Sequence, residues 1–125
     1  MDMMDNEATI STPAMRFDPS AGTLEMSGES YPENSFEFYA PLISLLETGM
    51  RELKSLRVAI KISYMNSSSV KCMLEILDIL KDNAARGMEI VIDWYYDREN
   101  SRALELAEEF REEVELPFNI LPLEG

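Results

Sequence analysis

The chain has no histidine, a single cysteine and 11 basic residues against 24 acidic ones. The absence of histidine excludes Ser-His-Asp and Cys-His nucleophilic catalysis, histidine acid/base chemistry and the usual mixed histidine and carboxylate zinc sites. The lone Cys72 cannot form an internal disulfide, which fits a reducing compartment. We therefore expect a cytoplasmic protein that is not an enzyme; the alternative is an enzyme that uses Asp93, Asp97 or glutamate residues without histidine.

The excess of acidic residues also limits the choice of partners. A formal net charge of −13 repels both a nucleic-acid backbone and an anionic membrane surface. No apolar run approaches the roughly 18 to 20 residues of a membrane-spanning helix, and the acidic N-terminus does not have the pattern of a secretory signal. Nucleic acid and membrane are therefore not expected as partners.

Two further absences concern cofactors and metals. The five glycines are scattered singly, so no glycine-rich phosphate-binding loop occurs. The glutamates that crowd residues 105–115 match no calcium loop and are typical of a solvated helix face. The sequence therefore predicts no cofactor, no metal site and no catalytic residue.

The apolar content is sufficient for one packed domain. The chain has 125 residues, of which 46% are hydrophobic, and five Tyr, five Phe and one Trp supply large core side chains. Residues 1–9 are polar and acidic without periodicity, so we expect a flexible lead there. The folded domain is expected to span residues 10–125.

Helix and strand patterns alternate along this domain. Residues 12–18 and 23–27 flank a turn and predict a β-hairpin. After it we expect a helix that begins between Asn34 and Ala40, a strand over residues 56–64, a helix from Asn66–Ser69 to Gly87, a strand over residues 88–96, a helix capped by Asp97 or Asn100, and a strand over residues 117–122. This β-β-α-β-α-β-α-β order predicts a single α/β domain with about three helices and a mixed sheet of four or five strands.

The clearest strand is that over residues 56–64, whose apolar residues alternate with Arg57, Ala59, Lys61 and Ser63. Period-two alternation places one set of side chains on the core. The predicted core-facing set is Leu56, Val58, Ile60, Ile62 and Tyr64.

Three consecutive serines follow this strand, and they lie where a helix begins. Serine is a preferred N-cap residue, so one of them can cap the helix while the others fill the loop. Alternatively one accepts phosphate, because free N–H groups and the positive end of the helix dipole suit an anion there, with Lys71 nearby. A phosphate adds about −1.5 to −2 charges, which would repel a partner matched to the neutral loop.

The single cysteine and most of the aromatic residues are better explained by packing in the core than by a catalytic role. Cys72 has no histidine or second cysteine beside it, so we expect a buried or half-buried structural thiol. Trp94, Tyr95 and Tyr96 alternate along a strand, so some of these rings must face away from Trp94. Most are expected in the core, although one exposed ring near the end of the sheet would make a good partner anchor.

Five short strings occur in order from about Ser11 to Phe118. They are Ser11–Ala14, Gly28–Asn34, Tyr64–Lys71, Trp94–Asp97, and Ala107–Glu113 followed by Pro117–Phe118. Together they resemble the SiaC family of regulatory phosphoproteins. The resemblance implies a fold similar to the anti-sigma-factor antagonist (STAS) domains, which place a phosphorylatable hydroxyl at the start of a helix after a strand.

The same resemblance implies a partner-switching function in cyclic di-GMP signalling, which controls biofilm or aggregate formation. In the family a Ser/Thr kinase adds the phosphate, a PP2C-type phosphatase removes it, and the unphosphorylated form binds and activates a diguanylate cyclase. The family acceptor is usually a threonine after the asparagine, and the matching residue is Ser67, with Ser68 and Ser69 as alternatives. Tyr64, Asn66, Ser68 and Lys71 are the expected partner contacts. An anti-sigma-factor antagonist that binds an anti-sigma ATPase is the alternative function.

Overall fold

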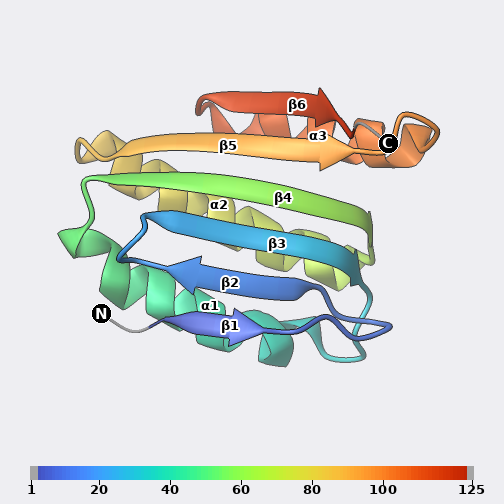
Figure 1. Ribbon diagram of the computed structural model, residues 1–125, viewed down its shortest axis with the longest axis horizontal. Coiled ribbons are helices and arrows are strands. Elements are labelled where there is room, and N and C mark those ends of the chain that lie inside the picture. The colour runs from blue at the N-terminus through green and yellow to red at the C-terminus, as the bar shows by residue number, and fades with distance from the viewer. Residues whose placement is uncertain (1–2, 124–125) are drawn as a thin grey trace.

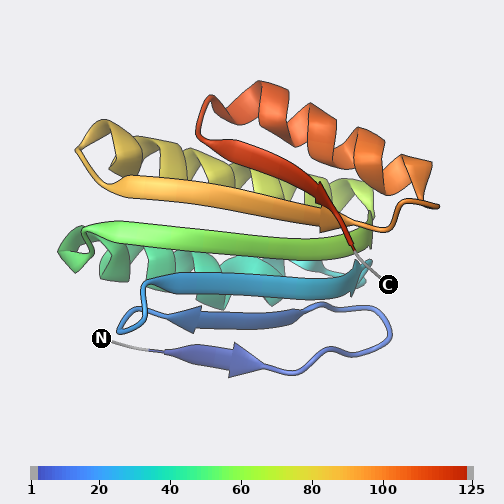
Figure 2. The ribbon, with the colours of Figure 1, turned by 45° about the horizontal axis from the view of Figure 1, so that its top comes forward.

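Six strands lie in the sheet in the order in which they occur along the chain (Figure 2). The computed structural model describes residues 3–123. The elements are β1 (Met4–Asn6), β2 (Ala14–Asp18), β3 (Thr23–Ser30), α1 (Ser35–Gly49), the 3₁₀ helix η1 (Met50–Glu52), β4 (Ser55–Met65), α2 (Ser67–Ala85), β5 (Glu89–Tyr96), α3 (Ser101–Val114) and β6 (Phe118–Pro122). The first three strands pair antiparallel, and β3 to β6 are parallel neighbours.

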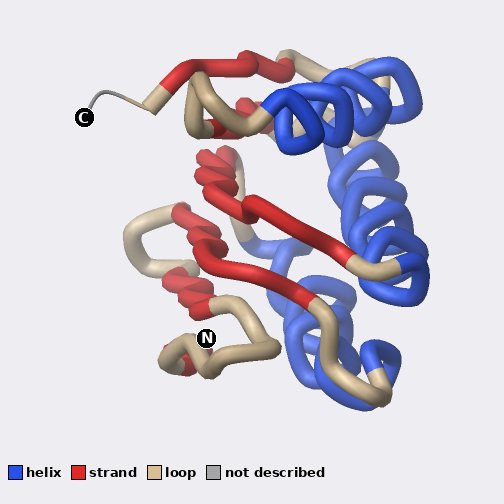
Figure 3. Tube along the Cα trace, turned by 90° about the vertical axis from the view of Figure 1, so that its right-hand side faces the viewer, coloured by secondary structure: helices blue, strands red, loops and turns tan. Residues whose placement is uncertain are grey.

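The three α-helices lie on one face of the sheet (Figures 1 and 3), and the apolar core is between them and the strands. Each parallel pair is joined by a helical crossover, as the alternating pattern of the sequence predicts. Trp94 is fully buried in this core and stacks on Phe110 and Phe118, whereas Tyr95 and Tyr96 are only partly buried. The predicted mixed α/β domain and its initial hairpin are confirmed.

The structure differs from the prediction at the N-terminus. Met4–Asn6 pairs antiparallel with β2 and forms a sixth strand, where a flexible lead over residues 1–9 and four or five strands were expected. Met4 also packs partly against the core. A three-residue edge strand is held largely by backbone hydrogen bonds, so it has too few side chains to show periodicity. Residues 1–2 of the expected lead and 124–125 of the expected domain lie outside the described residues.

Asparagine side chains fix where the helices begin. Asn34 Oδ1 accepts from the Glu37 amide at 3.1 Å, so α1 begins at Ser35, within the predicted range, and continues through Pro41. Asn100 Oδ1 accepts from the Ala103 amide at 3.0 Å and caps α3, which decides between the two predicted caps.

Candidate functional site at the start of α2

The predicted switch segment lies at the end of the central strand β4, where the chain turns into α2 (Figure 1). Asn66 separates the two elements, and its backbone N–H donates to the Ser30 carbonyl at the end of the neighbouring parallel strand at 2.9 Å. The site is thus at the carboxyl edge of the parallel strands, where α/β sheets usually place their functional loops.

Asn66 caps α2, which corrects the expectation that one of the serines does so. Its Oδ1 accepts from the Ser69 amide at 2.9 Å, and its Nδ2 donates to the Pro32 carbonyl at 3.3 Å. Asn66 therefore holds the start of α2 against the β3–α1 loop. None of the three serines is therefore needed as the N-cap of α2.

The three serines have different environments. Ser67 is the first residue of α2 and is exposed. Ser68 is half-buried, and its hydroxyl lies 2.8 Å from Ser35 Oγ. Ser69 is fully buried, with its Oγ 2.7 Å from Ser30 Oγ and 3.0 Å from Ser35 Oγ. Only Ser67 combines exposure with a position at the helix N-terminus.

Ser69 belongs to a buried chain of hydroxyl groups. Ser30 Oγ also lies 2.7 Å from the Tyr39 hydroxyl, so the chain continues from α2 through β3 to α1. Burial raises the pKa of Tyr39 to about 12, a shift that the Ser30 hydrogen bond opposes and the nearby Cys72 adds to. Tyr39 is therefore neutral at physiological pH, and the network is suited to neutral hydroxyl groups and not to a dianion.

The local field at Ser67 favours an added phosphate. Backbone N–H groups at the first positions of a helix lack intrahelical partners, and the dipole places partial positive charge there. The first turn of α2 carries no acidic residue, and Lys71 is exposed one turn further along. An anion at such an end is stabilised by about 0.3 to 1 kcal/mol.

Tyr64 is exposed, whereas the alternation of β4 places it on the core face. The pairing of β3 with β4 shifts after Gly28, so that Gly28 lies opposite Ile62 and Glu29 opposite Tyr64. Gly28 has φ 122°, which a residue with a side chain rarely adopts. The β-bulge leaves both Ser63 and Tyr64 facing outward, because bulges turn the following side chains to the other face.

Three exposed aromatic residues belong to the segments that meet at the serines, and we call them the aromatic patch: Tyr31, Phe36 and Tyr64. They are 37%, 55% and 50% exposed, and the Tyr31 and Tyr64 rings meet edge to face at 6.0 Å. Phe36 follows Ser35, which contacts Ser68. Sequence reasoning missed Tyr31 and Phe36; the signal for Phe36 was its place in the first turn after the Asn34 cap.

The other predicted residues differ in how accessible they are to a partner. Lys71 is exposed, whereas Asn66 and Ser68 are partly buried and already engaged in hydrogen bonds. Cys72 is fully buried, and burial raises the pKa of its thiol, so it is not an activated nucleophile. The glutamates of α3 are exposed to solvent as predicted.

Within residues 3–123, no three His, Cys, Asp or Glu side chains gather as metal ligands would. The described helices also include none that is both long and apolar enough to cross a membrane.

The comparison with known proteins decides between the families that share this architecture. Residues 6–123 match the family model described as SiaC family regulatory phosphoprotein. The chain belongs to the SiaC family of regulatory phosphoproteins. The predicted family and its regulatory function are thus confirmed.

Similar sequences and structures come from Pseudomonas aeruginosa. An uncharacterized protein of that organism is 43% identical over 113 residues, which is 90% of each chain. The solved structure of SiaC is 40% identical with a TM-score of 0.91 and covers 98% of this chain and 100% of its own. A crystal structure of the diguanylate cyclase SiaD in complex with its activator SiaC gives 40% identity and 0.91, over 96% and 99% of the two chains.

Proposed function

We propose that this chain is a non-enzymatic cytoplasmic switch protein whose unphosphorylated form binds and activates a diguanylate cyclase. The observation that carries the proposal is the solved complex in which SiaC, 40% identical to this chain, is the activator of the cyclase SiaD. That complex favours a cyclase over an anti-sigma ATPase as the partner. A Ser/Thr kinase would add the phosphate and a PP2C-type phosphatase would remove it.

Ser67 is the proposed phosphate acceptor. A kinase must bring the hydroxyl into its own active site, and Ser67 is the exposed serine of the three. Phosphate on Ser69 would have to enter the buried hydroxyl network, displacing its contacts with Ser30 and Ser35. Burying a charged group without matched partners costs several kcal/mol, which supports Ser67 over Ser69 as the acceptor.

The aromatic patch is the proposed anchor for the cyclase. Tyr and Phe side chains provide large apolar contact areas and are frequent at the energetic centre of interfaces. Ser67 lies three residues after Tyr64, and Ser35 joins the start of α1, next to Phe36, to Ser68. Phosphate at Ser67 would therefore add about two negative charges beside the docked partner, and like charge or an unpaired buried charge at an interface costs several kcal/mol.

The proposal is tested with the cyclase of the same organism by comparing the Ser67→Ala and Ser67→Asp variants. We expect Ser67→Ala to bind and activate the cyclase as the wild type does, and Ser67→Asp to bind at least about tenfold more weakly, since 1.4 kcal/mol corresponds to a factor of ten. Calorimetry gives the affinity, and cyclic di-GMP formation gives the activation.

Ser20→Asp is the matched control, because Ser20 is an exposed serine in the β2–β3 turn and receives the same charge. It should leave both readouts unchanged. Equal binding by Ser67→Ala and Ser67→Asp would contradict the switch, and equal loss in Ser20→Asp would assign the effect to net charge alone.

A further inference from the structure

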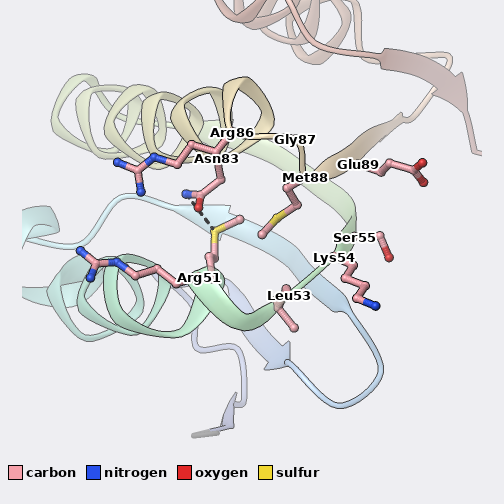
Figure 4. Close-up of a pocket in the computed structure, with 10 residues that line it drawn as sticks. Arg51, Leu53, Lys54, Ser55, Asn83, Arg86, Gly87, Met88 and Glu89 are labelled. Carbon is pink, nitrogen blue, oxygen red and sulfur yellow. Dashed lines mark hydrogen bonds between the residues drawn. The ribbon is translucent and has the colours of Figure 1, made fainter.

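A pocket of about 560 Å³ lies far from the switch, where the α1–β4 and α2–β5 connections meet (Figure 4). It is lined from residues 50–55 on one side and 83–89 on the other. Ser67 begins α2, whereas this pocket lies at its far end, and 19 helical residues extend over about 28 Å at 1.5 Å per residue. The pocket is therefore separate from the surface proposed for the cyclase.

The lining of this pocket has more basic than acidic residues. Arg51, Lys54 and Arg86 line it, and all three are exposed. They are three of only 11 basic residues in a chain of net charge −13, while Glu89 is the one acidic residue in the lining. Within residues 3–123 the one ion pair joins Arg57 to Asp93, so none of the three lining cations is neutralised by a carboxylate in contact.

Balancing the helix dipoles does not fully explain these cations. Basic residues stabilise the last turn of a helix, yet the last turns of α1 and α2 contain none. Arg51 lies in η1, Arg86 is the C-cap of α2, and Lys54 precedes β4 and belongs to neither helix. Arg51 and Lys54 thus come from the α1–β4 connection and Arg86 from the α2–β5 connection, and all three border the pocket, where a concave wall concentrates their field.

The arrangement of the lining suggests what the pocket binds. Arg51 and Arg86 extend toward the same side, Lys54 and Glu89 lie at the opposite side, and the apolar Leu53 and Met88 are between them (Figure 4). Guanidinium groups bind phosphate oxygens with paired hydrogen bonds, and the apolar side chains offer a surface to the body of a ligand.

The volume lies within the roughly 300 to 1,000 Å³ of ordinary small-molecule sites. We propose that this pocket binds a small organic phosphate of nucleotide size, with its phosphates held by Arg51 and Arg86.

The test is a titration of the full-length protein with guanosine 5′-triphosphate at near-physiological ionic strength, followed by calorimetry and by amide NMR shifts. We expect saturable binding, with the largest shifts at residues 51–55 and 86–89. The Arg51→Gln/Arg86→Gln variant should lose at least about tenfold in affinity, because it removes the charge-assisted hydrogen bonds to the phosphates. A parallel titration with inorganic triphosphate should show weaker binding, since it lacks a body to contact Leu53 and Met88.

The matched control is Arg102→Gln/Arg111→Gln, which removes the same charge from exposed positions of α3. It should bind as the wild type does. The proposal is overturned if no saturable binding is seen, if both double variants lose affinity equally, if the shifts map elsewhere, or if inorganic triphosphate binds as tightly as the nucleotide. None of these outcomes depends on the cyclase or on Ser67, so this site and the proposed switch fail or stand separately.

Discussion

Replacing Ser69 with alanine removes the hydroxyl at the centre of the buried network. Ser69 Oγ lies 2.7 Å from Ser30 Oγ and 3.0 Å from Ser35 Oγ. Neither partner hydroxyl is left without a hydrogen bond, because Ser30 Oγ still contacts the Tyr39 hydroxyl at 2.7 Å and Ser35 Oγ still contacts Ser68 Oγ at 2.8 Å. The cost is therefore that of two net hydrogen bonds, about 2 kcal/mol in the free energy of unfolding.

This cost can be measured by denaturation. At about 2.1 cal/mol/K per residue, the unfolding entropy of a chain of this size converts about 2 kcal/mol into a fall in melting temperature of about 8 °C. Trp94 is the single tryptophan and is fully buried, so its fluorescence reports urea unfolding directly. The control is Ser67→Ala at an exposed position, which should change stability by less than about 0.5 kcal/mol.

A double-mutant cycle of Ser69→Ala with Ser35→Ala should give a coupling of about 0.5 to 1.5 kcal/mol. If Ser69→Ala and Ser67→Ala destabilise the protein equally, the distinction between the buried and the exposed serine is wrong. Burial would then give no reason to prefer Ser67 over Ser69 as the acceptor.

Three further predictions follow from the same region. The pKa of Tyr39 rises from 10.0 to about 12 on folding. Below pH 10 the neutral phenol therefore makes its full contribution to the free energy of unfolding, and up to about 2.7 kcal/mol of this free energy is lost as the pH rises to about 12. Urea titrations of Tyr39→Phe should lack this part of the alkaline loss, and an identical pH dependence would refute the assignment. Asn66→Ala should lower the free energy of unfolding by about 1 kcal/mol. Asn66→Asp keeps the capping oxygen but loses the Nδ2 donor to the Pro32 carbonyl, so it should lower the free energy of unfolding by less, and equal losses in urea would refute the cap. Tyr64→Ala should weaken cyclase binding at least about fivefold in calorimetry, whereas Leu121→Ala, on β6, should not, and the reverse result would exclude the aromatic patch.

Periodicity was sufficient to predict most of the fold. The alternation from Leu56 to Ile62 and the helical spacing from Val70 to Leu80 correctly give a buried strand followed by a helix packed on it. The pattern failed at Tyr64 because a bulge depends on the pairing of two strands, and Gly28, which permits it, lies 36 residues earlier in the chain. The strand β1 was missed because three residues carry no periodic signal.

The position of the site was predictable from the sequence, but its capping residue and the different burial of its three serines were not. Any of the serines could cap a helix, and only the hydrogen bond that the Ser69 amide donates to Asn66 Oδ1 shows that none needs to. The contrast between exposed Ser67 and buried Ser69 arises from Ser30, Ser35 and Tyr39, which reach the network from other elements. No local sequence pattern contains those contacts, because they depend on how β3, α1 and α2 pack together.

The central claim is that Ser67 is the residue on which the switch acts. Peptide mass spectrometry of the protein isolated from its native cells, under growth conditions with and without biofilm formation, tests this claim most directly. The account predicts a single phosphate on Ser67 whose occupancy falls when the cyclase is active. Phosphate on Ser68 or Ser69 instead, or none under any growth condition, would contradict it.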